Sequence, residues 1–190
     1  MAIEDRRERE REARRRLIVA TARTLAEAEG WDAVTTRRLS TEIEYSQPVL
    51  YKHFAGMEQI AEAVALEGFD ELAQALRATR ADAGADTALT RIAQAYLAFA
   101  RDHPAVYDAM FTRATTLRFA ADDTPAPLAA TFAELHAAVA GVVGEPDADT
   151  LTEVFWSALH GLLTLNRTGR LRPDHHEERL RLLVERFTGS

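Results

Sequence analysis

The chain contains 190 residues, carries a formal net charge of −7 and has no cysteine. Its content of 47% hydrophobic and 28% charged residues is ordinary for a globular protein, and its length is sufficient for a substantial core. The absence of cysteine excludes disulfides, a thiolate nucleophile and a cysteine-based zinc site.

The sequence predicts neither a membrane span nor a secretory signal. The longest uninterrupted apolar run covers residues 137–143, whereas a span needs roughly 20 apolar residues. Residues 4–16 are densely charged, and a secretory signal needs an apolar segment near the N-terminus. We therefore expect a cytoplasmic protein with no membrane partner.

Charge is divided unevenly along the chain. Residues 1–55 hold 11 basic and 10 acidic side chains, whereas residues 56–190 hold 12 basic and 20 acidic ones. All of the excess negative charge therefore lies in the second part. This asymmetry permits the N-terminal region to face a polyanion.

Helical periodicity dominates the N-terminal region, where no strand-like alternation of useful length occurs. A first helix has apolar positions on one face and ends at Gly30. Its charged beginning offers ion pairs at i,i+4 spacing, such as Glu10–Arg14 and Glu12–Arg16.

Two short helices are predicted next. Thr35-Thr36 offers an N-cap for a helix that runs to about Glu44. Ser46 offers an N-cap for a helix to about Phe54, with Pro48 tolerated in its first turn. Three helices joined by tight turns are the size of a helix-turn-helix domain.

The remainder of the chain repeats the helical pattern. We expect a long helix after Gly56, a loop over 81–86, a proline break at His103-Pro104 and surface loops near 120–126 and 144–146. The predicted fold is all-α with about nine helices. The later helices are expected over 89–101, 105–113, 127–143, about 151–168 and 174–187.

Two segments of the N-terminal region form a recognisable motif, Gly30–Leu39 (GWDAVTTRRL) and Ser46–Phe54 (SQPVLYKHF). They resemble the DNA-binding domain of the TetR family of transcriptional regulators. The resemblance implies a helix-turn-helix domain over 1–56 and a larger helical ligand-binding and dimerisation domain over 57–190. A weaker resemblance, at Trp156, His160 and Gly161 and at 96–104, is to a Trp-His-Gly subtype of the family's C-terminal domain.

The second short helix would enter the major groove and present polar side chains to the bases. Gln47 is positioned to contact a base, and the resemblance implies that Tyr51, His53 and Thr36 contact phosphates. Leu39, Ile43, Val49, Leu50 and Phe54 would form the small core. The full predicted DNA-binding set is Thr36, Arg37, Tyr45, Ser46, Gln47, Pro48, Tyr51, Lys52 and His53.

Several of these roles have plainer alternatives. Tyr51 and His53 could be ordinary surface residues, and a base contact by Gln47 stays open. Residues 14–16, all arginine, could be an arm that grips DNA or a solvated, salt-bridged helix face.

The sequence also departs from the family pattern at two positions. Glu44 stands where the family usually has glycine, which accepts a positive φ at little cost, so we expect a strain of about 1 kcal/mol or a different turn. Glu44 also places a negative charge near DNA. Met57 stands where the family often has lysine. Both changes suggest altered operator preference or weaker affinity.

A symmetric dimer would supply two recognition helices, and it needs a self-complementary apolar face. Apolar residues near the C-terminus provide a candidate, with internal core packing as the alternative. The predicted interface residues are Leu151, Phe155, Leu159, Leu162, Leu180, Leu183 and Phe187.

Aromatic and histidine side chains of the second part would suit a cavity for a mostly apolar small molecule. For each residue alone, plain core packing is the alternative, and the resemblance is what favours a pocket. The predicted ligand-binding residues are Tyr96, Phe99, Tyr107, Met110, Phe111, Phe132, His136, Trp156 and His160.

The leading functional hypothesis is a homodimeric repressor that a small ligand releases from a palindromic operator. The alternative is a DNA-binding regulator without a small-molecule effector. A helical enzyme is a remote third, because the sequence has no GxSxG, HExxH or glycine-rich phosphate loop. The run 175–178, His-His-Glu-Glu, fits a solvated helix start better than a metal site. We therefore expect no catalytic residues, no metal and no cofactor.

Overall fold

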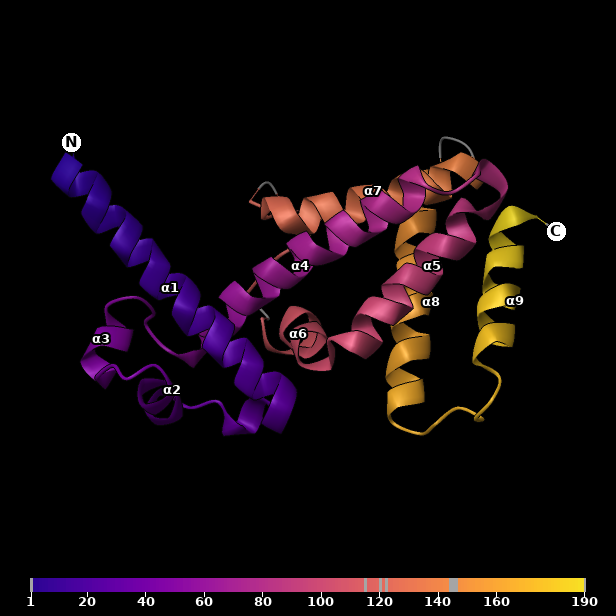
Figure 1. Ribbon diagram of the computed structural model, residues 1–190. Helices are drawn as coiled ribbons and strands as arrows, with labels where there is room; N and C mark the ends of the chain where they lie inside the picture. Colours follow the sequence, from indigo (N-terminus) through magenta and orange to yellow (C-terminus); the bar gives the residue numbers. More distant parts are fainter. Residues whose placement is uncertain (1, 115, 120, 122, 144–146, 190) are drawn as a thin grey trace. The chain divides into compact units, whose positions relative to one another are not determined.

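The fold is described from a computed structural model, which describes residues 2–114, 116–119, 121, 123–143 and 147–189. Within these residues the secondary structure is entirely helical, with nine α-helices (Figure 1). The all-α prediction is therefore confirmed. The chain forms two compact units, residues 1–68 with 103–123 and residues 69–102 with 124–190.

The first unit contains the predicted helix-turn-helix. Its core includes the fully buried side chains of Ile18, Leu39 and Leu50. Helix α1 contacts α2 and α6, and α2 contacts α3. The elements of this unit are α1 (Ala2–Glu29), the 3-10 turn η1 (Trp31–Ala33), α2 (Thr36–Glu42), α3 (Gln47–Tyr51), the beginning of α4 (Met57–Ala81), α6 (Pro104–Asp108) and the π-helical turn η2 (Ala109–Arg113).

The second unit is a helical bundle. Helix α5 contacts α7, α8 and α9, and α7 also contacts α8 and α9. Tyr96, Phe155 and Leu159 are among the side chains that fill its core. Its elements are the remainder of α4, α5 (Ala85–Asp102), α7 (Ala126–Val143), α8 (Ala148–Arg167) and α9 (His176–Thr188).

Most predicted helix boundaries agree with the structure, because their signals are local. Gly30 follows α1 with a φ of 83°, and Pro104 begins α6. The loop predicted over 81–86 is shorter, since α4 continues to Ala81 and α5 begins at Ala85. The expected break at 144–146 lies outside the described residues, as do 120 and 122 of the expected loop at 120–126. The predicted functional boundary at 56/57 coincides with the start of α4 and stays a prediction.

By length and composition alone, helix α7 is apolar enough to cross a membrane. The sequence prediction of no membrane span counted only uninterrupted apolar runs and did not detect this helix as a candidate span. A core helix of a bundle passes the same test. The buried carboxylate of Glu134 on α7 pairs with Arg77 and Arg80 of α4, at 2.8 and 2.9 Å. Thr131 donates a hydrogen bond of 2.8 Å to the carbonyl of Phe69. These polar contacts fit a helix that packs inside the second unit.

Candidate nucleic-acid interface

The turn between α2 and α3 has a defined backbone geometry. The side chain of Thr35 caps α2 by accepting a hydrogen bond of 3.1 Å from the N–H of Arg38, as predicted. At the other end, the N–H of Tyr45 donates to the carbonyl of Ser40 and that of Glu44 to the carbonyl of Thr41. This pair of bonds is a Schellman motif, which requires a left-handed residue after the helix.

Glu44 supplies that left-handed residue, with a φ of 56°. Glycine is favoured at such a position because a Cβ atom makes the conformation unfavourable by roughly 1–2 kcal/mol. Of the two alternatives drawn from the sequence, the turn therefore keeps its geometry and Glu44 carries the strain. Met57, the second departure, is the half-buried first residue of α4.

Helix α3 begins directly after the turn. Ser46 occupies the N-cap position with an extended backbone, and Pro48 lies in the first turn, as predicted. The hydroxyl of Ser46, however, makes no capping hydrogen bond. That part of the prediction is wrong: proline at the second helical position has no N–H to donate, and the N–H of Val49 donates to the backbone carbonyl of Ser46 instead, at 2.9 Å.

The apolar side of α2 and α3 packs in the domain, and the polar side lies at the surface. Leu39, Ile43, Leu50 and Phe54 are buried as predicted, whereas Val49 is only half-buried. Of the nine predicted DNA-binding residues, three are half-buried and six are exposed. The half-buried ones are Thr36, Tyr45 and His53, and the exposed ones are Arg37, Ser46, Gln47, Pro48, Tyr51 and Lys52.

The polar side chains of α3 are available to a partner. Tyr51 is 53% exposed, a large value for an aromatic residue. Within the part of the chain that the structure describes, no hydrogen bond or ion pair engages the side chains of Gln47, Tyr51 or Lys52. These exposed side chains come from α3 and from Lys52, its C-cap residue.

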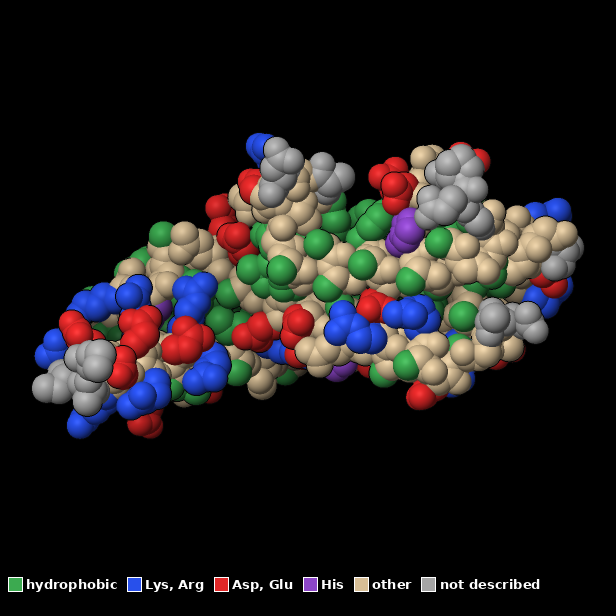
Figure 2. Space-filling view, turned by 90° about the horizontal axis from the view of Figure 1, so that it is seen from above, with side chains coloured by type: hydrophobic (Ala, Val, Ile, Leu, Met, Phe, Trp, Pro, Cys, Tyr) green, Lys and Arg blue, Asp and Glu red, His purple; other side chains and the backbone are tan. Residues whose placement is uncertain are grey.

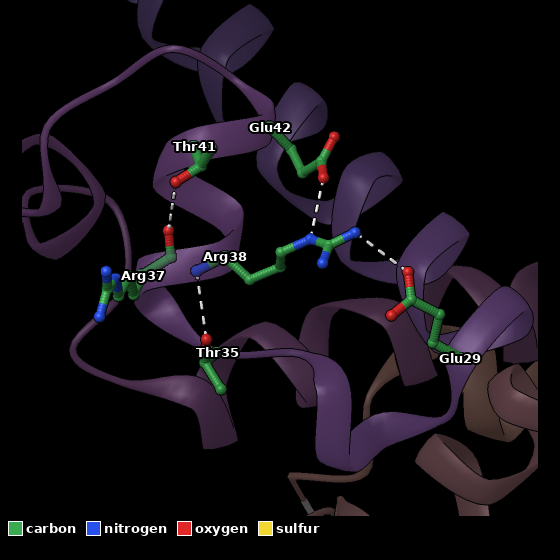
Figure 3. Close-up of polar contacts among 6 residues, drawn as sticks. All are labelled: Glu29, Thr35, Arg37, Arg38, Thr41 and Glu42. Atoms are coloured by element: carbon green, nitrogen blue, oxygen red, sulfur yellow. Dashed lines mark hydrogen bonds and ion pairs between the residues drawn. The ribbon is translucent and has the colours of Figure 1, made fainter.

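The two adjacent arginines of α2 have different roles. The guanidinium of Arg38 pairs with Glu42 at 2.9 Å and with Glu29 at 3.0 Å, which ties α2 to the end of α1 (Figure 3). Figure 3 shows the side chain of Arg37 turned away from these carboxylates. Arg37 is therefore the arginine of this pair that remains available for an outside contact.

Arg15 of α1 holds the end of α3. Its guanidinium donates a hydrogen bond of 3.0 Å to the carbonyl of His53 and lies 4.1 Å above the centre of the Phe54 ring. Sequence reasoning grouped Arg15 with its neighbours as an arm or a solvated face and missed this role. Arg15 precedes the buried Ile18 and Val19 by three and four residues, so it lies on the buried face of α1. This spacing could have indicated the role of Arg15 from the sequence.

His53 is surrounded by positive charge. Its pKa lies below the ordinary histidine value, first because the imidazole is partly buried and then because Arg11, Arg14, Arg15 and Lys52 disfavour protonation. The unbound protein therefore presents a neutral imidazole at this position near neutral pH. A neutral ring retains one N–H donor for an anionic oxygen.

Neither of the two ion pairs predicted along the start of α1 forms within the described residues. Glu10 pairs with Arg6 at 2.9 Å rather than with Arg14. A glutamate can reach one turn in either direction along a helix, so the spacing alone did not decide between the two arginines. No ion pair joins Glu12 to Arg16 within the described residues.

The predicted ligand-binding residues are divided between the units. Tyr107, Met110 and Phe111 belong to the first unit, where the rings of Tyr107 and Phe111 lie 4.5 Å apart. The other residues, which are Tyr96, Phe99, Phe132, His136, Trp156 and His160, belong to the second unit.

Within the second unit some of these side chains meet. The indole N–H of Trp156 donates a hydrogen bond of 3.0 Å to the hydroxyl of the fully buried Tyr96. The rings of Phe132 and His136 lie 6.4 Å apart, and His136 contacts Asp149 at 3.2 Å. Burial lowers the pKa of His160.

The predicted dimer residues include several that the chain buries within itself. Phe155 and Leu159 are 0% exposed and Leu180 is also buried, so these three form core and offer no surface to a second chain. The rings of Phe155 and Phe187 pack edge to face at 5.1 Å. Leu151, Leu162, Leu183 and Phe187 are half-buried.

One apolar face of α8 does reach the surface, and it includes Leu151 and Leu162 of the predicted set. Val154 is 52% exposed and Leu165 is 39% exposed. The spacing of 151, 154, 158, 162 and 165 places these positions on one side of the helix. The predicted set therefore combines core positions of α8 with positions that reach its surface, and the dimer interface itself stays a prediction.

The region around 175–178 has the character of a helix start. His175 and Glu177 are exposed, and Glu178 pairs with Arg181 at 2.8 Å. Among the residues that the structure describes, no group of three or more histidine or acidic side chains is arranged to hold a metal ion.

Two family models match parts of this chain. Residues 18–64 match the family described as bacterial regulatory proteins of the tetR family. Residues 89–187 match the tetracyclin repressor-like C-terminal domain. The Trp-His-Gly subtype stays a prediction.

Similar proteins include a relative in sequence and a solved structure of similar fold. The uncharacterized HTH-type transcriptional regulator Rv0681 of Mycobacterium tuberculosis is 35% identical over 160 residues, covering 82% of this chain and 71% of the relative. The structure of a protein of unknown function from Rhodococcus sp. RHA1 has a TM-score of 0.73 at 25% identity and covers 92% of this chain and 93% of that one.

A second similar structure is that of BioQ with its natural double-stranded DNA operator. Its TM-score is 0.66 at 21% identity, and the match covers 91% of this chain and 96% of that one, a likeness of fold. Together, the two family matches and the curated relative establish that this chain belongs to the TetR family of DNA-binding transcriptional regulators.

Proposed function

We propose that the protein acts as a homodimer that binds a palindromic DNA operator through α3 and represses transcription until a small, mostly apolar ligand releases it. The observation that carries the DNA-binding part is the state of the α3 side chains. Gln47, Tyr51 and Lys52 are exposed and without polar partners in the described structure, on a helix whose apolar side is packed.

The chemistry of these side chains suits duplex DNA. A glutamine amide can pair bidentately with adenine in the major groove, and an arginine such as Arg37 can pair with guanine. The hydroxyl of Tyr51, the ammonium of Lys52 and the imidazole of His53 can contact phosphates and set the register of the helix. The operator seen with BioQ, a protein of similar fold, is consistent with this use of the domain.

Dimerisation is supported by the exposed apolar face of α8. Leu151, Val154, Ala158, Leu162 and Leu165 form a stripe that a second copy would cover in an isologous interface. Two copies of α3 would then address half-sites about 34–36 Å apart, or a multiple of that distance.

The ligand part of the proposal depends on the second unit. Tyr96 and Trp156 supply apolar surface with polar tips that already hydrogen-bond to each other. Such a pair can exchange its internal hydrogen bond for one to a bound molecule. A ligand would release DNA only by its difference in affinity for the bound and released conformations.

Selection of bound duplexes from a random pool tests the DNA-binding part. We expect a near-palindromic consensus with two half-sites, whereas a pool that stays random after several rounds would refute specific binding. Size-exclusion chromatography with light scattering tests the dimer.

A thermal-shift screen against apolar metabolites, repeated on Trp156→Phe, tests the ligand. A compound that stabilises the protein and releases the selected duplex supports release by a ligand. A broad library without a stabiliser supports the regulator without a small-molecule effector.

A further inference from the structure

The buried face of α1 continues toward the N-terminus as a row of arginines. Ile18, Ala22 and Ala26 follow one another at a spacing of four residues and are buried in the first unit. Side chains three or four residues apart lie on the same side of a helix. Arg15, Arg14 and Arg11 lie three, four and seven residues before Ile18. They therefore lie on or beside the same face of the helix.

Arg15 fixes where this row lies relative to α3. It donates to the carbonyl of His53 at 3.0 Å and covers the Phe54 ring at 4.1 Å. Arg11 is one helical turn away from Arg15, and Arg14 is its neighbour. The row therefore extends outward from the end of α3, where Tyr51 and Lys52 are exposed.

The electrostatics of His53 agree with this placement. After partial burial, the causes that lower its pKa are the charges of Arg11, Arg14, Arg15 and Lys52, with no carboxylate among them. Residues 1–55 as a whole are nearly neutral, whereas the charges that act on His53 are all positive. The face of the molecule seen in Figure 2 shows Lys/Arg and Asp/Glu side chains intermingled over the N-terminal part of α1.

Arg11 and Arg14 are also available. Both are exposed, and within the described part of the chain neither guanidinium takes part in an ion pair or hydrogen bond. Glu10, the carboxylate expected to pair with Arg14, is instead engaged by Arg6. The guanidinium of Arg15, by contrast, already donates a hydrogen bond to the carbonyl of His53 at the end of α3.

We propose that Arg11 and Arg14 are phosphate-binding residues that extend the contact surface of Tyr51, Lys52 and His53 along α1, so that α1 grips the DNA backbone next to the half-site. This proposal rests on the proposed function, namely operator binding by α3. A guanidinium binds phosphate bidentately with charge-assisted hydrogen bonds. Contacts to phosphate increase affinity and fix orientation but carry no base information.

The test compares two double variants of the full-length protein on the selected operator. Arg11→Gln/Arg14→Gln removes the proposed contacts. Arg9→Gln/Arg16→Gln removes the same charge from exposed arginines on another side of the same helix. Affinity is measured by fluorescence anisotropy at a series of salt concentrations, and circular dichroism verifies that both variants are folded.

We expect Arg11→Gln/Arg14→Gln to weaken binding at least tenfold at low salt. Each lost phosphate contact reduces the slope of log K against log salt by about 0.9, so the slope should fall by about two per bound protomer. The consensus selected from a random pool should not change. The control variant should keep a slope close to that of the wild type.

Phosphate ethylation interference gives a second readout. Modified phosphates that block the wild type but no longer affect Arg11→Gln/Arg14→Gln would locate the contacts. Equal slopes for the two double variants, or an unchanged interference pattern, would overturn the proposal. Failure of the wild type itself to select an operator would instead refute the proposed function, so the two failures are distinguishable.

Discussion

The indole N–H of Trp31 donates a hydrogen bond of 2.8 Å to the backbone carbonyl of Ala105. The two residues are 74 positions apart in the sequence, and both are buried. Beside them, the carboxylate of Glu27 accepts hydrogen bonds of 3.1 Å from the N–H groups of Ala105 and Val106. The helix-turn-helix region is thus joined to the first turn of α6 by three polar contacts.

Trp31→Phe should reduce the free energy of unfolding. The variant keeps an aromatic ring but leaves the buried carbonyl of Ala105 without its donor, which costs about 1–3 kcal/mol. Urea denaturation followed by circular dichroism measures the loss. Tyr51→Phe is the matched control, because its exposed hydroxyl has no partner in the described structure. It should leave stability unchanged while weakening DNA binding on all sequences.

Glu44→Gly should stabilise the protein. Glu44 has a φ of 56°, and glycine relieves the left-handed strain by about 1 kcal/mol. Glu44→Ala removes the same charge but keeps a Cβ atom, so it should show no comparable gain. Equal stabilisation by the two variants in urea denaturation would contradict the backbone explanation and point to charge instead.

Gly68→Ala should lower the stability of the first unit strongly. A Cβ atom at this position of α4 would lie 2.4 Å from Cγ1 of Val106 and 2.9 Å from Sδ of Met110. Both distances are shorter than van der Waals contact, and overpacking typically costs about 1–3 kcal/mol. Gly141→Ala, on α7, meets nothing within 4 Å and should be neutral or slightly stabilising. Thermal unfolding of the two variants separates close packing from helix propensity.

His160 should make stability depend on pH below about 6.5, the ordinary histidine pKa. Burial lowers its pKa in the folded chain, so the unfolded chain binds more protons in this range. The linkage relation then requires stability to fall as the pH decreases through this window. Unfolding free energies at pH 7.5 and pH 5.5 should therefore differ more for the wild type than for His160→Gln. A difference of the same size in both proteins would exclude His160 as a source of the pH dependence of stability.

Val154→Arg should disrupt the dimer without unfolding the chain. Val154 is 52% exposed, so the substitution adds a charge to the proposed interface while the core is preserved. Glu153→Arg introduces the same residue one position earlier, about 100° around the helix. Light scattering should give a monomer for the first variant and a dimer for the second, and a dimer for both would place the interface elsewhere.

The sequence by itself determined the helices, because their caps and breaks are local signals. Gly30, Thr35 and Pro104 mark helix boundaries through backbone conformation, and these positions agree with the structure. The buried set of Leu39, Ile43, Leu50 and Phe54 followed from apolar spacing within short elements. The motif ending in Phe54 likewise carried the family resemblance before any tertiary contact was known.

Only the tertiary structure decided which of several similar side chains forms an ion pair and which is buried. Arg37 and Arg38 are adjacent and chemically identical, yet Glu29 and Glu42 engage only Arg38. On α8 the periodicity covers both a buried and an exposed row, and packing against neighbouring helices places Phe155 inside and Val154 outside. The physical reason is that charge and hydrophobicity belong to single residues, whereas pairing and burial depend on neighbours that the fold brings from distant parts of the chain.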